Sequence, residues 1–203
     1  SIEFAHDGSI ASLYDKVLCR EWVGGDFNKL KMYHDTPGNY DAWDILPNYK
    51  DKQEKITVES PLSFVSCDDE CARFSVTLAT EKSRWQMIIR LFRRSRGIEI
   101  ENIVDWNEKH RLAKAEFGCN VLSRELVCDT SAGFIRRETH RNTSWQQARF
   151  EVCHHKWCDM SEHGGGIALI NQGKYGVSAE NNVMALSLHL LLFLYRLFHN
   201  HLP

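Results

Sequence analysis

Residues 72–78 (ARFSVTL), 85–92 (WQMIIRLF) and 98–103 (IEIENI) decide the fold class of this chain. Apolar and polar side chains alternate along each run, and Arg96-Gly97 supplies a turn between the last two. Successive side chains of a β-strand point to opposite faces, so each run offers one face to a core and the other to water. The three runs therefore predict strands of an antiparallel sheet.

The same character extends in both directions along the chain. Asp7-Gly8 separates two short apolar runs and predicts a hairpin, and residues 55–59 alternate like the strands above. No sequence repeat and no alternation of helix with strand is visible, which argues against a parallel α/β sheet. We expect an all-β fold, a large antiparallel β-sandwich. Further strand-like runs are residues 115–121, 150–152, 166–170 and 175–177.

The composition is that of an ordinary globular protein, with 43% hydrophobic and 26% charged residues. Its 203 residues suffice for one large domain or two small ones. A formal net charge of -2 gives no general attraction to nucleic acid or to anionic membranes, so neither is an expected partner. No secretory signal is visible, and the first residues already look like a strand. We therefore expect an internal piece of a longer polypeptide.

The C-terminal stretch, residues 186–198 (LSLHLLLFLYRLF), breaks the alternating pattern. It is nearly continuous in hydrophobic residues, but it is short for a membrane span of ~20 residues and is interrupted by His189 and Arg196. We expect either a strand that runs into a short helix or a disordered, truncated end. The chain accordingly divides into a β-sandwich domain at residues 1–188 and an atypical hydrophobic tail at residues 189–203.

Seven cysteines are spread along the chain, an odd number that does not form a compact disulfide framework. Together with the lack of a secretory signal they favour reduced thiols in the cytoplasm, with a vacuolar or lysosomal location as the alternative. The pairs Cys67 and Cys71, and Cys153 and Cys158, differ in spacing from the recurrent Cys-x2-Cys of zinc sites. We expect no metal to be bound by this chain, and small core or surface cysteines instead.

Signatures of several other chemistries are missing from the sequence. There is no Gly-x-Ser-x-Gly nucleophile elbow and no cysteine-protease signature. The glycines at residues 164–166 lack the Gly-Lys-Ser/Thr of a phosphate loop. The basic residues 93–96 lack the interleaved aromatics of a nucleic-acid surface and predict a solvated turn. No catalytic residue is predicted within the chain.

Two polar, aromatic-rich stretches form the candidate site: residues 33–44 (YHDTPGNYDAWD) and residues 139–162 (THRNTSWQQARFEVCHHKWCDMSE). Neither alternates like a strand, and both combine aromatic rings with charged groups. An aromatic ring covers the C–H face of a sugar while charged groups bind its hydroxyls. The alternative interpretation is a buried aromatic corner whose acids cap turns. The candidate residues are Tyr40, Asp41, Trp43, Asp44, His140 and Arg141.

At these residues the chain resembles the C-terminal β domain of class II α-mannosidases, glycoside hydrolase family 38, in particular the cytosolic and vacuolar branch. Residues 34–45 (HDTPGNYDAWDI) resemble its Asp-x-Pro-x-x-Trp-Asp-Ala-Trp-Asp segment, with Tyr40 in the place usually held by Trp. Residues 104–112 (VDWNEKHRL) resemble Val-Asp-Trp-His-Glu-Lys-His-Lys-Leu, with Asn107 replacing His. Further matches are residues 139–145, 148–152, 155–157, 168–169 and 174–176, in a likeness that covers roughly residues 2–188.

This resemblance implies a supersandwich of the galactose mutarotase-like kind, which packs against an N-terminal catalytic domain of the same polypeptide. In full-length members that domain holds one zinc ion through two Asp and two His. It also supplies an Asp nucleophile and an acid/base Asp for retaining hydrolysis of terminal α-mannose. None of those motifs is present in the 203 residues. A mannose-containing oligosaccharide is the implied ligand, and the six candidate residues become candidates for the rim of its pocket.

Three hypotheses remain open from the sequence. In the first, the chain is the C-terminal β domain of a zinc-dependent retaining α-mannosidase, is truncated at its C-terminus, binds no zinc itself and is inactive alone. The alternative is a free-standing carbohydrate-binding β-sandwich that uses Tyr40, Trp43 and Trp145. The third is an unrelated structural or interaction domain whose tail docks a partner.

Overall fold

The computed structural model describes residues 1–40 and 44–190, and most of its regular structure is β-strand. Within these residues every pairing between strands is antiparallel. The elements are β1 (Ile2–Phe4), β2 (Ile10–Asp15), β3 (Arg20–Glu21), β4 (Val23–His34), η1 (Tyr49–Lys52), β5 (Gln53–Glu54), β6 (Thr57–Cys67), β7 (Cys71–Ala79), β8 (Arg84–Phe92), β9 (Ile98–Asp105), β10 (Arg111–Cys119), β11 (Glu125–Thr130), β12 (Gly133–Glu138), α1 (Ser144–Ala148), β13 (Val152–Cys153), β14 (Trp157–Glu162), β15 (Gly165–Ile170), β16 (Gly176–Glu180) and β17 (Val183–Leu190).

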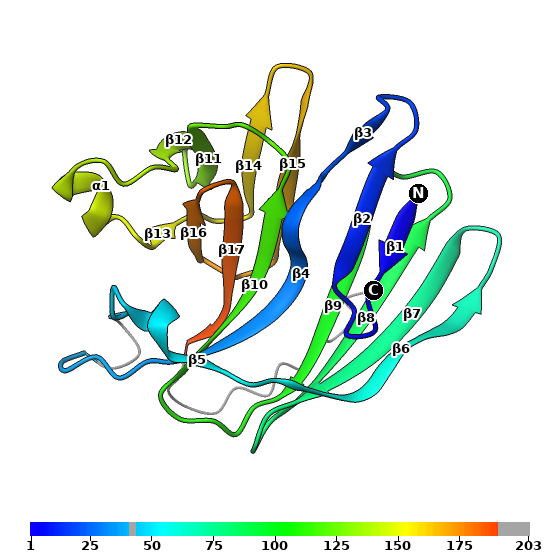
Figure 1. Ribbon diagram of the computed structural model, residues 1–203, viewed down its shortest axis with the longest axis horizontal. Coiled ribbons are helices and arrows are strands. Elements are labelled where there is room, and N and C mark those ends of the chain that lie inside the picture. The colour runs from blue at the N-terminus through cyan, green and yellow to red at the C-terminus, as the bar shows by residue number, and fades with distance from the viewer. Residues whose placement is uncertain (41–43, 191–203) are drawn as a thin grey trace.

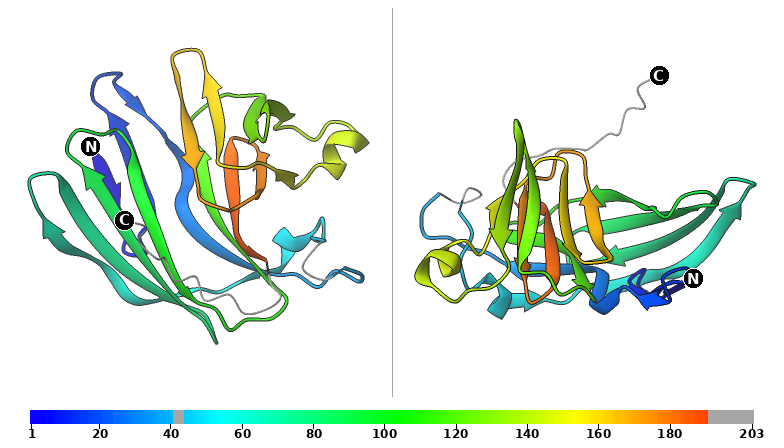
Figure 2. Two further views of the ribbon diagram at one scale, coloured as in Figure 1. Left: turned by 180° about the vertical axis from the view of Figure 1, so that it is seen from behind. Right: turned by 90° about the horizontal axis from the view of Figure 1, so that it is seen from above.

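A six-stranded sheet, in the order β13-β16-β17-β10-β4-β5, runs through the middle of the molecule (Figure 1). The four-stranded sheet β6-β7-β8-β9 lies on one side of it, and the four-stranded sheet β12-β11-β14-β15 lies on another (Figures 1 and 2). A small sheet, β1-β2-β3, continues from the chain start into β4. The central sheet therefore links the two four-stranded sheets.

Two hydrophobic cores hold these sheets together, and the six-stranded sheet contributes to both. Leu30, Met32 and Ala113 of β4 and β10 pack with Trp85 and Ile89 of β8. Burial of each large side chain of this kind contributes about 1.5–3 kcal/mol. The second core joins the central sheet to β11 and β14 and includes Phe27, Phe117, Leu126, Cys128, Cys158, Met160 and Met184.

The three runs that predicted the fold class form β7, β8 and β9, paired in antiparallel register. Val76 lies opposite Met87, and both side chains are buried against β4 and β10. On the outer face of β8, Arg90 forms an ion pair with Glu101 of β9 at 2.5 Å. The alternation thus separates a core face from a solvent face, and the expected all-β antiparallel sandwich is confirmed.

The predicted hairpin at Asp7-Gly8 is also confirmed, because β1 and β2 pair on either side of it. Gly8 has a φ of 81°, a conformation that favours glycine. A Cβ atom at this position would lie 2.7 Å from Cγ1 of Val76. The close approach of this turn to β7 therefore requires glycine.

The strand-like run expected at residues 150–152 overlaps β13, and both polar stretches contain further strand that their lack of alternation did not indicate. The first stretch begins with the end of β4, whose 12 residues reach His34. The second contains the one-turn helix α1, then β13 and the six residues of β14. Both stretches alternate for only a few residues at a time, which hides short strands beside turns from a search by period.

The hydrophobic C-terminal stretch begins as the strand β17, which pairs with β10 and β16. Residues 191–203 lie outside the described part of the chain. No helix among the described residues is long and apolar enough to cross a membrane.

Candidate functional site

The two polar stretches meet at one end of the six-stranded sheet. Ile45, next to the first stretch, and Phe150, within the second, pack against the same small cluster. That cluster consists of Tyr33 from β4, Tyr49 from η1 and Leu112 from β10. Figure 1 shows η1 at this end of the sheet, beside β5. Two segments far apart in sequence thus share one packing site.

Within the first stretch Tyr33 and Asp35 are buried, whereas residues 38–40 and Asp44 are exposed. Tyr40 is 77% exposed and has a φ of 57°. The backbone N–H of Asp44 donates to the carbonyl oxygen of Tyr40 at 3.0 Å, and Oδ1 of Asp44 accepts from the N–H of Ile45 at 3.0 Å. Asp41 and Trp43 lie outside the described residues. Tyr40 and Asp44 are therefore available to a ligand that approaches from solvent.

The carboxylate of Glu180 contacts both the second polar stretch and the helix η1. Nη2 of Arg141 and Nζ of Lys50 lie 3.0 and 3.1 Å from the same oxygen, Oε2 of Glu180. This carboxylate, at the end of β16, connects η1 to the segment before α1. His140 is half-buried, and its Nδ1 is buried without a hydrogen-bond partner among the described residues. Arg141 is thus held in place, while His140 keeps one unused nitrogen.

A buried charge network lies beneath this surface. Lys114 of β10 has a fully buried side chain whose Nζ lies 2.5 Å from Oε2 of Glu151. The same ammonium donates to Oγ of Ser178 at 3.1 Å, and Oγ of Ser187 donates to Oε1 of Glu151 at 2.5 Å. Burial lowers the pKa of Lys114, and the Glu151 carboxylate partly offsets that effect. The network joins β10, β16 and β17 to the polar stretch that carries Glu151.

A second set of charges continues along the same face of β4 and β10. Oη of Tyr33 donates to Oε1 of Glu116 at 2.6 Å, and Nζ of Lys31 lies 2.7 Å from Oε2 of the same carboxylate. Burial and the neighbouring Glu116 raise the pKa of Tyr33, so its hydroxyl stays protonated. Tyr33 also contacts Tyr49 edge to face, at 5.0 Å between ring centroids. This face of the sheet therefore combines buried ion pairs with the small cluster of Tyr33, Tyr49 and Leu112.

An open pocket of about 270 Å³ lies beside the Lys114–Glu151 pair. It is lined by both polar and apolar side chains and by the backbone of two glycines. Lys174 is half-buried in this lining, and burial lowers the pKa of its ammonium group. Within the described residues Lys174 has no carboxylate partner within ion-pair distance. The lining side chains are Ile45, Glu151, Lys174, Tyr175, Ser187 and Leu188.

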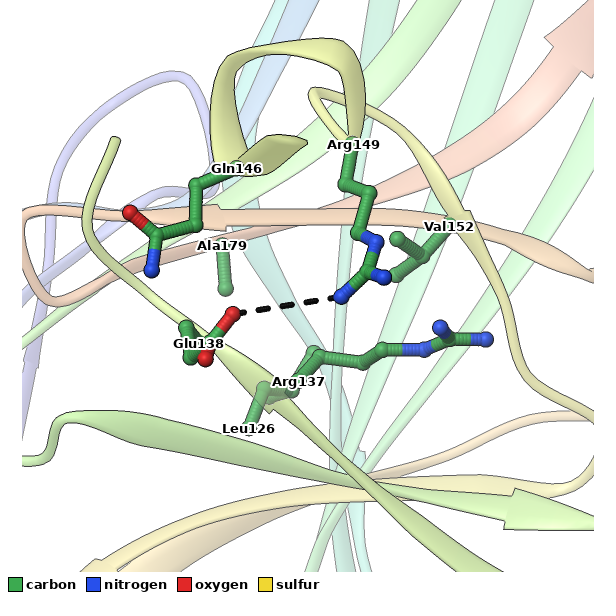
Figure 3. A pocket seen from close by; sticks show the side chains of 7 residues that line it. All are labelled: Leu126, Arg137, Glu138, Gln146, Arg149, Val152 and Ala179. Atoms are coloured by element: carbon green, nitrogen blue, oxygen red, sulfur yellow. Dashed lines mark ion pairs between the residues drawn. The ribbon is translucent and has the colours of Figure 1, made fainter. Parts of the chain in front are cut away.

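A second cavity lies between β11, β12 and the end of α1 (Figure 3). Glu138 and Arg149 face each other across it, with 3.9 Å between Oε2 and Nη1. Its volume of about 10 Å³ holds one water molecule at most. This cavity is too small for a sugar or a cofactor.

Among the described residues, no three His, Cys, Asp or Glu side chains converge as a metal site would require. All seven cysteines are free, and four of them are buried. Cys128 and Cys158 lie directly opposite each other on β11 and β14, yet remain unlinked. The described residues thus offer no zinc-binding set.

Sequence reasoning missed the residues that organise this site. Lys114 and Glu180 were not candidates, because a charged residue in a strand is usually expected to face solvent. Glu151 and Lys174 matched the family pattern without an assigned role. The sequence did contain one signal of the buried ion pair: Lys114 and Glu116 alternate with Ala113 and Ala115 along a mainly apolar strand. Charged groups on one face of such a strand require partners when they are buried.

The sequence matches a family model, the glycosyl hydrolases family 38 C-terminal domain, over residues 1–192. Similar proteins include an alpha-mannosidase of Saccharomyces cerevisiae, 32% identical over 197 residues, and alpha-mannosidase 2C1 of Homo sapiens, 31% identical over 185 residues. Alpha-mannosidase G of Dictyostelium discoideum is 34% identical over 203 residues. The alignments cover 89%, 89% and 93% of this chain but only 18% of each relative.

Solved structures show the same fold at low sequence identity. An alpha-mannosidase from Enterococcus faecalis superposes with a TM-score of 0.75 at 10% identity, covering 92% of this chain and 24% of that one. A family 38 glycosyl hydrolase from the same species gives a TM-score of 0.73, also at 10% identity, covering 92% of this chain and 25% of that one. The match to the family model over nearly the whole sequence shows that this chain belongs to the glycosyl hydrolase family 38 C-terminal domain family.

Proposed function

We propose that this chain acts as the C-terminal β domain of an α-mannosidase that removes terminal α-mannose from oligosaccharides. The observation that carries the proposal is its membership of the family 38 C-terminal domain family over residues 1–192. Its curated relatives are alpha-mannosidases, of which it spans 18% of the length. The proposed partner is therefore an N-terminal catalytic domain of the same polypeptide.

The geometry of the site supports a rim role and not a complete active centre. Glycoside hydrolysis uses a pair of carboxyl groups on either side of the scissile bond. Glu151 is engaged by Lys114, and Glu180 by Lys50 and Arg141, so that Asp44 is the described carboxylate that the six rim residues expose to solvent. The rim residues that we propose for mannoside contact are Tyr40, Asp41, Trp43, Asp44, His140 and Arg141.

The zinc ion and the retaining chemistry belong, in this proposal, to the N-terminal catalytic domain. The described residues of this chain do not fit zinc, because no three of their potential ligands converge. What this chain supplies is binding and orientation of a sugar at a surface held rigid by buried ion pairs. The chain by itself is accordingly proposed to be inactive.

The test is complementation. The 203-residue chain is expressed with and without the N-terminal region encoded upstream of Ser1, and hydrolysis of p-nitrophenyl α-mannoside is measured. We expect hydrolysis only when both parts are present. An N-terminal region that turns over the substrate equally well without this chain would contradict the proposal, as would activity of the chain alone.

A second candidate, a free-standing carbohydrate-binding β-sandwich, is favoured by one observation. The pocket of about 270 Å³ beside Glu151 has the mixed polar and apolar lining of a small-ligand site, at a volume just below the usual range. This candidate predicts mannoside binding by the chain together with no gain of activity on addition of the upstream region.

The free thiols support a cytoplasmic location, in preference to a vacuolar or lysosomal one. The seven cysteines are an odd number spread along the chain and do not form a compact disulfide framework. Disulfides persist in oxidising compartments and are rare in the cytosol. Fractionation of cells that express a tagged form of the whole protein tests the location directly.

A further inference from the structure

We propose that the pocket beside Glu151 is a subsite for one neutral pyranose ring, with the Tyr175 ring against the sugar's C–H face and Lys174, Ser187 and Glu151 on its hydroxyls. This subsite involves residues outside the six rim candidates. It rests on the proposed function for the choice of mannose as the sugar.

The pocket offers the mixed groups that a sugar requires. Tyr175 is 57% exposed beside the carboxylate of Glu151 and the ammonium of Lys174. Ile45 and Leu188 add apolar surface. A pyranose ring has apolar C–H patches and a periphery of hydroxyls that both donate and accept, so an aromatic ring with charged neighbours matches it.

The polar groups retain capacity for a ligand. Lys174 has three N–H donors and no carboxylate partner among the residues that the structure describes. Each oxygen of Glu151 accepts one hydrogen bond, from Ser187 and from Lys114, while a carboxylate has about four acceptor positions. Because Lys114 already neutralises Glu151, hydroxyl groups suit this carboxylate better than a second cation would.

The loop that carries Lys174 and Tyr175 is fixed from below. Nδ1 of the fully buried His154 lies 3.2 Å from the carbonyl oxygen of Tyr175, and its Nε2 lies 2.7 Å from Nδ2 of Asn171. Oδ1 of Asn171 accepts from the backbone N–H of Lys174 at 2.8 Å. The ring of His155 also contacts that of Tyr175 edge to face, at 5.7 Å. The pocket is therefore preorganised, which reduces the entropic cost of binding.

Gly176 keeps the floor of the pocket open. A Cβ atom at this position would lie 3.0 Å from Oε1 of Glu151 and 3.1 Å from Oγ of Ser187. Any larger residue would press on both polar groups that face the ligand. Glycine at this position therefore preserves their access to the pocket.

The test is a chemical-shift titration of the isotope-labelled 203-residue chain with methyl α-D-mannopyranoside. A monosaccharide in such a site is expected to bind with a Kd on the order of 1 mM. We expect shifts concentrated at Ile45 and at residues 173–176 and 187–188. Tyr175→Ala and Lys174→Gln should each weaken binding by about tenfold. The matched controls Tyr14→Ala and Lys16→Gln, at exposed positions of β2 and the turn after it, should leave the Kd unchanged.

Three results would overturn the subsite. The first is no saturable shift at ligand concentrations on the order of 50 mM. The second is binding that neither pocket variant weakens. The third is a response to inorganic phosphate but not to the mannoside, which would make the pocket an anion site. If the chain binds the mannoside but hydrolysis is not restored, the proposed enzymatic role is refuted and the subsite stands. If hydrolysis is restored but the chain does not bind the mannoside, the subsite is refuted and the proposed enzymatic role stands.

Discussion

Lys114 and Glu151 form a buried ion pair at 2.5 Å that joins the central strand β10 to the second polar stretch. The lysine side chain is fully buried, and that of Glu151 is 12% exposed. Because Ser187 and Ser178 provide further hydrogen bonds, neither charge is left without compensation. The pair fixes the floor of the proposed sugar subsite, so its energetics bear on both stability and binding.

Removal of one partner should destabilise the fold strongly. We expect Lys114→Ala to lower the free energy of unfolding by about 3–5 kcal/mol, since it leaves Glu151 as an uncompensated buried charge. The double variant Lys114→Met with Glu151→Leu should cost much less, because no charge remains buried. Urea denaturation of the two variants measures the difference between their free energies of unfolding.

The exposed pair Arg84–Glu59 is the matched control, with side chains 62% and 44% exposed. Arg84→Ala should change the free energy of unfolding by less than about 1 kcal/mol. Equal losses for Lys114→Ala and Arg84→Ala would refute the structural role of the buried pair.

Acid should loosen the loop that carries Tyr175 through protonation of His154. Burial lowers the pKa of His154 below its ordinary value of 6.5, while the nearby His155 lowers it further and Asp129 and Glu151 oppose the shift. The unfolded chain therefore takes up the proton first, and stability falls as the pH drops below 6.5. The loss from this group can reach about 1.4 kcal/mol per pH unit.

Urea denaturation at a series of pH values tests whether the free energy of unfolding falls as the pH drops below 6.5. His154→Gln should be less stable than the parent at neutral pH, and its stability should fall less between pH 6.5 and lower values. The matched control is His163→Gln, a change at an exposed histidine. A variant at His154 that retains the full acid sensitivity would show that other groups cause it.

The buried cysteines should be chemically inert in the folded chain. Burial raises the pKa of Cys119 and Cys158 to about 12 and that of Cys128 to about 11, so the reactive thiolate is scarce at neutral pH. Mass spectrometry after brief iodoacetamide treatment should find label at the exposed Cys19, Cys67 and Cys153. Labelling of Cys158 as fast as Cys19 without denaturant would contradict the packing of β11 against β14.

Arg141 should contribute to substrate binding in the assembled enzyme. Its guanidinium is held by Glu180 and is 27% exposed, so it can donate to a sugar hydroxyl. Loss of a charged hydrogen bond costs about 1.5–3 kcal/mol, and we expect Arg141→Ala to lower kcat/KM for p-nitrophenyl α-mannoside about tenfold or more. Arg136→Ala, at an exposed pair on β12, should have no effect on kcat/KM. Equal kcat/KM for both variants would remove Arg141 from the rim.

The sequence predicted those parts of the fold in which one pattern runs long enough to be read. β7, β8 and β9 each alternate over most of their length, and the hairpin at Asp7-Gly8 has turn residues between apolar runs. The helix α1 was missed although Thr143 and Gln146 form a capping box, a local signal that can be recognised without a structure.

The site was harder to predict because it depends on contacts between distant segments. Lys114 and Glu151 are 37 positions apart, and nothing local to either residue indicates the other. Both polar stretches were recognised, and Ile45 and Phe150 do lie in one cluster. Which side chains face the pocket, such as Lys174 and Ser187, depends on strand pairing that periodicity alone does not give.

Hydrolysis of p-nitrophenyl α-mannoside can be measured for this chain, for the upstream N-terminal region and for the two together. We predict turnover only for the combination, because Glu151 and Glu180 are engaged in ion pairs and no three potential zinc ligands converge among the described residues of this chain. Turnover by the N-terminal region that does not change when this chain is added would contradict the account.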